Sequence, residues 1–330
     1  MNKKILAVII AWTGIYAVLA VIFASFGFLG KNYTKADAGA PTQIKTENNT
    51  SLGKEISLKR GDKIEKMPLE TYICGVTAAE MPASFETEAL KAQAVAARTY
   101  TYSKMNKNIP EHGGADVCDN INHCKAYLSE EELKAKHGEQ WMNEYYPKIK
   151  NAVSETAGII ATYDGEPITA VFHSTSSGMT ENSKDVWNGD VPYLVSVKSE
   201  GEEESPRYTD TAVFSLSDFK NKILSIGNNA VFSDNPQEWV GEITHNESGS
   251  VNTIVIGGVP FKGTQIRTAL GLRSTNFEIA VADSVKITTK GNGHGVGMSQ
   301  YGANHMAKLG YTYEQILKKY YTGIKIEKTN

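Results

Sequence analysis

The pattern of hydrophobic positions begins with one long run near the N-terminus. After Lys3 and Lys4, residues 5–30 carry no charge and are mostly apolar, and Lys31 then ends the run. A membrane core of about 30 Å needs only about 20 residues in a helix, whereas the apolar part of a signal peptide spans about 7–15 residues. A sequence like a cleavage site, Ala38-Gly39-Ala40, lies well beyond the run. We therefore expect an uncleaved transmembrane helix, with its basic end in the cytoplasm and the rest of the chain outside.

After the predicted anchor, the composition of the chain indicates first a linker and then a folded region. Residues 31–52 are polar and show no apolar periodicity, which is typical of a flexible stalk. In residues 53–330, short strand and helix patterns are interspersed without the regular order of a parallel sheet. This region is therefore predicted to be an extracytoplasmic catalytic domain of the α+β class, with residues 209–283 as a candidate for a smaller inserted lobe.

The first helix of this domain is predicted from its apolar spacing. Leu69, Ile73, Val76 and Ala79 recur at helical intervals, and Pro82 must end the helix because proline cannot continue it. This helix is therefore expected to stop just before the proline.

The second helix is expected to begin at Ser84, which could serve as its N-cap, and to continue through Tyr100. Its alanine-rich sequence is apolar almost all round, so the helix should be buried with close neighbours. Glu80 therefore lies where one helix ends and a buried helix is about to begin.

Strand patterns recur later in the chain, and its last segment is helical. The strand-like runs are residues 158–163, 168–173 and 285–289. A glycine-rich loop follows the third run and leads into two helices. Thr312 and Gln315 form a capping box for the last helix, and Gly323 is expected to stop it.

Glu80 is the first candidate for chemistry because its neighbours are apolar. Ala78, Ala79, Met81 and Pro82 flank it, and an apolar setting disfavours the carboxylate and raises its pKa. A carboxyl group that keeps its proton near neutrality can act as a general acid toward a glycosidic oxygen. The alternative is an ordinary carboxylate at the solvated end of a helix.

Gln93 and Arg98 lie within the alanine-rich helix, where buried polar groups need hydrogen-bond partners. These side chains could hold a sugar or orient a carboxylate. They could equally make internal structural contacts, and the pattern does not decide between the two.

The second candidate cluster has the pattern H-x5-C-x4-H-C. It consists of His112, Cys118, His123 and Cys124. Two thiolates and two imidazoles so close in sequence could form a tetrahedral zinc site, although the spacing is unlike the common zinc-finger patterns. A Cys118–Cys124 disulfide is the rival interpretation, because disulfides form readily outside the cell. The third cysteine, Cys74, lies in an apolar stretch and is predicted to be a buried, unreactive thiol.

Two further motifs do not support the chemistry that they resemble. The glycine-rich loop 291–300 lacks the Gly-Lys-Ser/Thr end of a phosphate-binding loop, and Val296 breaks the dinucleotide pattern. Tight turns that bring the backbone and His294 to a cleft are the better interpretation, with His294 as either a substrate contact or a structural histidine. His173 precedes a Ser-Thr-Ser-Ser loop, but the chain has no nucleophile elbow to support a serine hydrolase.

Overall charge excludes one class of partner. The 330 residues carry a net charge of −3 and an apolar fraction of 41%, both ordinary for a globular chain. No basic field argues for binding to nucleic acid.

Four segments carry a more specific pattern. They are YICGVTAAEMPASFETEALKAQAVAARTYTYS, FHSTSSGMTENSKDVW with DVPYLVSVKS, IRTALGLRSTNFEI and GNGHGVGMSQYGANHMA. In this order, and spread over most of residues 69–321, they resemble the stage II sporulation protein D family. The expected anchor and stalk agree with that resemblance.

The resemblance implies a lytic transglycosylase of peptidoglycan. Such an enzyme cleaves linkages between N-acetylmuramic acid (MurNAc) and N-acetylglucosamine (GlcNAc), and leaves 1,6-anhydro-MurNAc ends during engulfment of the forespore. The family's catalytic glutamate falls on Glu80, and its residues important for activity fall on Gln93, Arg98, Tyr193 and Tyr301, which we expect to line the glycan groove. Clostridial members carry a similar Cys/His loop, which favours a structural zinc ion over the disulfide.

The resemblance also implies partners and a location. The partners are peptidoglycan glycan strands, a cell-wall amidase (SpoIIP-like) that first strips the stem peptides, and a membrane scaffold (SpoIIM-like). The location is the sporulation septum and the engulfing membrane.

A single acid suffices for the implied reaction. Glu80 would protonate the leaving oxygen and then take a proton from the sugar's own C6 hydroxyl as it closes on C1, so that neither water nor a second carboxylate nor a cofactor is required. Three other functions stay open. They are a non-catalytic glycan-binding activator of an amidase, a zinc-dependent amidase or peptidase, and a hydrolase that uses Glu80 with water.

Overall fold

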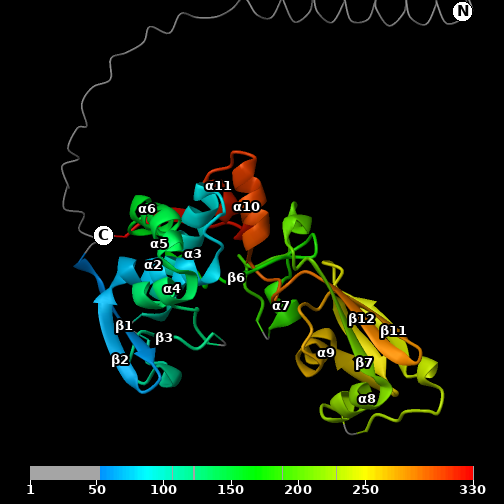
Figure 1. Ribbon diagram of the computed structural model, residues 1–330. Coiled ribbons are helices and arrows are strands. Elements are labelled where there is room, and N and C mark those ends of the chain that lie inside the picture. The colour runs from blue at the N-terminus through cyan, green and yellow to red at the C-terminus, as the bar shows by residue number, and fades with distance from the viewer. Residues whose placement is uncertain (1–52, 106, 122, 188, 228, 330) are drawn as a thin grey trace, which may run out of the picture. The chain divides into compact units, whose positions relative to one another are not determined.

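The computed structural model describes five stretches of the chain (Figure 1), namely residues 53–105, 107–121, 123–187, 189–227 and 229–329. The predicted transmembrane helix and stalk fall in residues 1–52, outside the described residues. Within the described stretches, no helix is both long enough and apolar enough to cross a bilayer.

Helices and several small sheets are interspersed along the chain, which confirms the predicted mixture of helices and short strands. The helices are α2 (Leu69–Glu80), α3 (Thr87–Lys104), α4 (Glu130–His137), α5 (Glu139–Glu144), α6 (Tyr146–Glu155), α7 (Ser183–Val186), α8 (Leu216–Leu224), α9 (Gly263–Leu270), α10 (Gln300–Lys308) and α11 (Tyr313–Tyr320). Short 3-10 turns are η2 (Pro110–His112), η3 (Glu202–Glu204) and η4 (Pro236–Glu238). The strands are β1 (Glu55–Arg60), β2 (Lys63–Pro68), β3 (Val117–Cys118), β4 (Ile159–Tyr163), β5 (Glu166–Pro167), β6 (Phe172–His173), β7 (Thr209–Ser215), β8 (Val240–His245), β9 (Val251–Ile256), β10 (Val259–Lys262), β11 (Phe277–Val281), β12 (Ser284–Lys290), β13 (Met298–Ser299) and β14 (Lys325–Lys328).

Helix α3 lies at the centre of the first hydrophobic core. Its alanines Ala89, Ala92, Ala94 and Ala96 are fully buried, and such small side chains allow the neighbouring helices α2 and α6 to approach closely. The three-stranded sheet β2–β1–β3 lies beside α2 (Figure 1). The burial of the alanine-rich run on nearly all sides is as its composition predicts.

Of the two helix boundaries next to Glu80, the end of α2 is as predicted, whereas the start of α3 is not. Helix α2 ends at Glu80, as the following proline requires. Helix α3 begins at Thr87, so the prediction of Ser84 as its N-cap is wrong. Glu86 occupies the N-cap, and its backbone N–H donates to Asn304 Oδ1 on α10 at 2.8 Å. A tertiary contact therefore fixes this helix start in place of a local serine.

A second hydrophobic core lies within residues 212–287 and shares no residue with the first. It is built by the sheets β10–β9–β8 and β11–β12–β7, with α8 packed on β7 and β12 and α9 packed on β9 and β10. Ser248 and Ser250, in the turn between β8 and β9, donate to Oε2 of the buried Glu181 at 2.6 and 2.9 Å. These bonds tie the second core to the segment that follows β6.

The parallel pairing of β6 with β13 positions the site. Strand β6 covers only Phe172–His173, so the strand predicted over 168–173 is shorter than expected. Met298 and Ser299 pair with these two residues. Ser299 then caps α10 by accepting the backbone N–H of Gly302 at 3.3 Å. The loop after β6 and the start of α10 therefore lie side by side.

The last helix confirms its predicted start. Thr312 and Gln315 form the capping box of α11. The helix ends at Tyr320, and Gly323 follows beyond the cap in the left-handed conformation, with φ of 74°. The glycine therefore shapes the turn after the helix and does not itself stop it.

Candidate functional site

A pocket of about 430 Å³ opens where α2 ends, and Glu80 lines it. The other lining residues come from the turn after α2, strand β6 and the loop after it, the segment before β7, the glycine-rich loop and the start of α10. They are Pro82, Phe172, His173, Ser174, Ser205, Pro206, Arg207, Asn292, Gln300 and Tyr301. Glu80 is the one carboxylic acid among these described residues, in the company of hydroxyl groups, amides and aromatic rings. Such a lining suits a ligand rich in hydroxyl groups.

The surroundings of the half-buried Glu80 favour its protonated form. Burial raises the pKa of this carboxyl group above its usual range, and two smaller effects oppose the rise. The backbone N–H of Ala126 donates to Glu80 Oε1 at 2.8 Å, and the positive charge of Lys125 lies nearby. The Lys125 ammonium packs over the rings of Phe172 and Tyr100, 3.9 and 4.4 Å from their centres. The net upward direction is what a general acid needs near neutrality.

A pair of amides fixes the main chain at Glu80. Gln300 Nε2 donates to the Glu80 carbonyl oxygen at 3.0 Å and to Gln93 Oε1 at 3.2 Å. Gln93 is fully buried, and its own Nε2 makes no hydrogen bond within the described residues. Gln93 was expected to line the groove, but it lies behind the pocket wall and reaches the site through Gln300.

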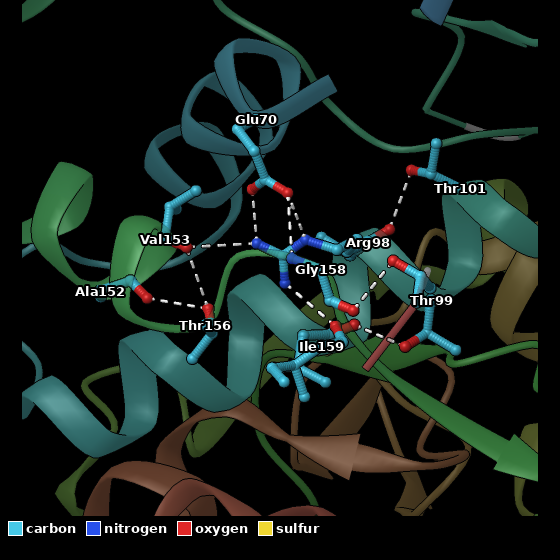
Figure 2. A network of polar contacts seen from close by, with 12 residues as sticks. Glu70, Arg98, Thr99, Thr101, Ala152, Val153, Thr156, Gly158 and Ile159 are labelled. Carbon is cyan, nitrogen blue, oxygen red and sulfur yellow. Dashed lines mark hydrogen bonds and ion pairs between the residues drawn. The ribbon is translucent and has the colours of Figure 1, made fainter. Parts of the chain in front are cut away.

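Arg98 was expected to contact substrate, but the structure gives it an internal role. Its side chain is fully buried, and Nη2 and Nε donate to the two carboxylate oxygens of Glu70 at 2.6 and 2.9 Å (Figure 2). The same guanidinium donates to the carbonyl oxygens of Val153 and Ile159 at 3.3 and 3.2 Å. Arg98 therefore holds α2, α6 and β4 together and does not line the pocket. Of the two roles that the sequence left open, the geometry supports the internal contact.

The two predicted tyrosines lie in different places. Tyr301 lines the pocket, with its ring edge-on to that of Phe85 and 4.9 Å between the ring centres. Tyr193 is not among the residues that line this pocket. Its hydroxyl accepts the backbone N–H of Thr169 at 3.0 Å, and its ring lies 5.5 Å from that of Tyr163. The structure thus brings only the first of these tyrosines to the pocket.

Two histidines, one from strand β6 and one from the glycine-rich loop, lie close together at the pocket. His173 lines it, and burial lowers the pKa of this imidazole to about 4, so the ring is neutral at physiological pH. Its Nδ1 donates to the Val296 carbonyl oxygen at 3.2 Å. The His294 ring lies 5.7 Å from His173 and 5.0 Å from Trp187, and its Nδ1 accepts the Val296 N–H at 3.1 Å. His294 is not among the residues that line this pocket.

The structure brings the Cys/His cluster together. Its ligand atoms all lie within 4.8 Å of one another. His112 Nε2 lies 3.2 Å from Cys124 Sγ, and His123 Nδ1 lies 3.4 Å from Cys118 Sγ. In a tetrahedral zinc site with bonds of about 2.0–2.3 Å, the ligand atoms stand roughly 3.3–3.8 Å apart. The donor set therefore fits a zinc ion, the closest pairs of ligand atoms lie near the spacing of such a site, and both cysteines are free thiols.

The Cys/His cluster is joined directly to the pocket. Lys125 and Ala126 follow Cys124 immediately, and they supply the charge and the N–H that act on Glu80. Neither residue could be found from the sequence, because no local pattern links them to a carboxyl group so far away; Ala126 lies 46 positions from Glu80. Cys74 lies outside the cluster as a buried free thiol, and burial raises its pKa to about 12, as an unreactive thiol requires.

The pocket therefore presents a carboxyl group with a raised pKa beside hydroxyl, amide and aromatic groups, a combination that suits general-acid chemistry on a polyhydroxylated ligand. A family model described as "Stage II sporulation protein" matches residues 58–163. The chain is 44% identical to stage II sporulation protein D of Bacillus subtilis over 273 residues, which is 81% of this chain and 76% of that protein. Identity to stage II sporulation protein D of Bacillus amyloliquefaciens is 43% with the same coverage.

A more distant similarity extends to the protein named amidase enhancer of Bacillus subtilis. Identity is 29% over 301 residues, which is 76% of this chain and 39% of that protein. With the matches above, the chain belongs to the stage II sporulation protein D family. It is therefore a protein of the sporulation programme.

Proposed function

We propose that this protein is a lytic transglycosylase that cleaves MurNAc–GlcNAc linkages of peptidoglycan and leaves 1,6-anhydro-MurNAc ends during forespore engulfment. The observation that carries the proposal is Glu80, a half-buried carboxyl group with a raised pKa in a pocket suited to sugars. Family membership suggests a cell-wall enzyme, in agreement with a glycan substrate. A paired-carboxylate hydrolase needs a second acid, and the described residues that line this pocket include none besides Glu80.

Glu80 acts twice in this reaction. Its proton passes to the glycosidic oxygen while the bond from C1 to that oxygen breaks and the ring gains oxocarbenium character. The C6 hydroxyl oxygen of the same sugar then bonds to C1, and its proton returns to Glu80, so that no water is consumed. The Ala126 N–H stabilises the carboxylate that exists between the two transfers. Gln300 holds the backbone of Glu80 in place meanwhile.

The raised pKa of Glu80 predicts how the rate depends on pH. Only the protonated carboxyl can donate, so kcat/KM should fall about tenfold per pH unit above the pKa of Glu80 in the folded protein. Lys125→Met removes a positive charge that lowers this pKa. The falling limb of the pH–rate profile should therefore move to higher pH. A shift toward lower pH would contradict this electrostatic assignment.

Mass spectrometry of glycans released from purified sacculi tests the proposed reaction. The expected product has muramyl ends that are lighter by one water than ordinary reducing ends. Reducing ends would indicate a hydrolase that uses Glu80 with water, and free stem peptides would indicate an amidase or peptidase at the Cys/His cluster.

A second candidate function is that of a non-catalytic glycan-binding activator of a cell-wall amidase. The observation in its favour is the similarity to a protein named amidase enhancer. In that case, sacculi incubated with this protein alone should release no glycan fragments, whereas peptide release by an added amidase should increase.

The anchoring and partners that we propose come from the sequence and the family. Residues 1–30 would hold the enzyme in the membrane, with residues 53–330 outside the cytoplasm at the sporulation septum and engulfing membrane. Its partners there would be glycan strands, a SpoIIP-like amidase and a SpoIIM-like scaffold.

We propose in addition that the Cys/His cluster holds a structural zinc ion. The ligands would be His112, Cys118, His123 and Cys124. Four protein ligands leave no position for water or substrate, as in structural zinc sites. The bound ion would therefore supply stability to the loop that ends in Lys125 and Ala126, and so to their contacts with Glu80.

Chelation should remove one zinc ion per chain and lower the midpoint of thermal unfolding by roughly 10 °C or more, because metal binding contributes to folding free energy. Cys124→Ser should have the same effect, whereas Cys74→Ser, outside the cluster, should keep the metal. Metal analysis and thermal unfolding measure both quantities. Purified protein without zinc and lighter by two hydrogens would instead indicate a Cys118–Cys124 disulfide.

A further inference from the structure

One cation lines the pocket that holds Glu80. Arg207 is exposed there, and it is the only lysine or arginine among the described lining residues. Its guanidinium makes no hydrogen bond or ion pair with any described residue; only its backbone N–H is bonded. Nearby Arg273, by contrast, pairs with Asp210, with 3.3 Å from Nε to Oδ2. The side chain of Arg207 is therefore available to a ligand in the pocket.

The backbone at Arg207 is held firmly against the pocket wall. The buried Ser205 accepts the Arg207 backbone N–H at 3.2 Å and the Thr175 hydroxyl at 2.9 Å. Thr175 in turn exchanges two backbone hydrogen bonds with Asn292, at 3.1 and 2.7 Å. Arg207 therefore lies in a turn that hydrogen bonds connect to two other segments lining the same pocket.

The charge balance of the pocket favours a negatively charged ligand. Glu80 is uncharged in the acid form that donates its proton, and burial keeps the His173 ring neutral. Arg207 then supplies the only formal charge among the described lining residues. Arginine binds carboxylates through two parallel hydrogen bonds, which adds geometric selectivity to charge attraction.

We propose that Arg207 binds the lactyl carboxylate of the sugar whose C1 is attacked, and so determines which linkage of the glycan is cut. The proposal rests on the transglycosylase function above. The two alternating sugars of the strand differ in this group: MurNAc carries a lactyl ether with a carboxyl group at its end, whereas GlcNAc has only a hydroxyl at that position. A guanidinium that lines the same pocket as Glu80 would therefore place MurNAc, and not GlcNAc, over the catalytic acid.

Chemically altered substrate provides the test. The full-length protein is given peptide-free glycan strands, in which the lactyl carboxylate is not tied up in an amide bond, and the same strands with that carboxyl reduced to an alcohol. For the wild type, kcat/KM should be about 10- to 100-fold lower on the reduced strands. Arg207→Gln should show this loss on native strands and little further loss on reduced ones. Arg273→Gln, which removes an arginine outside the pocket, should behave as the wild type, and Arg207→Lys should recover part of the native rate.

The possible outcomes separate this inference from the function on which it rests. Two results would overturn the role of Arg207: equal cleavage of native and reduced strands by the wild type, or a wild-type kcat/KM for Arg207→Gln on native strands. In either case, anhydro-muramyl ends in the products would still support the transglycosylase. If the wild type released no anhydro-muramyl ends from native strands, the transglycosylase and the subsite would both be overturned.

Discussion

Glu80→Gln should lower the rate of glycan cleavage by about 10³-fold or more while leaving the fold intact. General acid–base catalysis by a positioned group contributes about 10²–10⁴-fold, and the amide can neither protonate the leaving oxygen nor take a proton from the C6 hydroxyl. Its Oε1 can still accept the backbone N–H of Ala126. Because a neutral side chain avoids the burial of charge that raises the pKa of Glu80, the midpoint of thermal unfolding should be unchanged or slightly higher.

Glu86→Gln is the matched control for this variant. It removes an exposed carboxylate six residues away, at an N-cap position where the side chain makes no capping hydrogen bond. Turnover of peptide-free glycan strands and thermal unfolding should both match the wild type for this control. A rate for Glu80→Gln within about tenfold of the wild type would show that another group supplies the proton.

Arg98→Met should destabilise the folded protein by about 3–5 kcal/mol, because it leaves the Glu70 carboxylate without its buried partner. The change also removes the donors to the carbonyl oxygens of Val153 and Ile159. For a chain of this size, the midpoint of thermal unfolding should fall by roughly 6–20 °C. Loss of activity in this variant would then follow from loss of fold and not from a missing substrate contact.

Two further variants test whether the ion pair is the cause. Adding Glu70→Leu to Arg98→Met removes both charges together and should recover much of the lost stability. Lys134→Gln breaks an exposed ion pair with Glu139, at 2.6 Å and with side chains 57% and 66% exposed, and should cost less than about 1 kcal/mol. Urea unfolding measures all of these variants. A loss for Arg98→Met no greater than for Lys134→Gln would contradict the assigned role.

Features of the fold that depend on neighbouring residues were predictable from the sequence. The apolar spacing and the following proline located the helix that ends at Glu80, and the pair Thr312 and Gln315 located the start of α11. The alanine-rich composition correctly predicted a helix buried on nearly all sides, although not its first residue. In each case, the physical cause acts within a few positions along the chain.

Features that depend on distant partners were not predictable. The backbone N–H of Glu86 donates to Asn304, 218 positions away. The nearby Ser84 therefore predicted the wrong start for this helix. The sequence did not show whether Arg98 binds a sugar or a carboxylate, because its partner Glu70 lies 28 positions earlier in the chain. The arginine that lines the pocket, Arg207, follows a proline in a segment without any periodic pattern. Only the folded chain brings such residues to their partners.

The most direct test of a single-carboxyl mechanism is whether water enters the product. When the full-length protein cleaves peptide-free glycan strands in ¹⁸O-labelled water, the new muramyl ends should carry no label. The oxygen that joins C1 comes from the sugar's own C6 hydroxyl, with Glu80 as both acid and base. Label at C1 of the new ends would contradict this mechanism, because it would show that water, and not the sugar, completes the reaction.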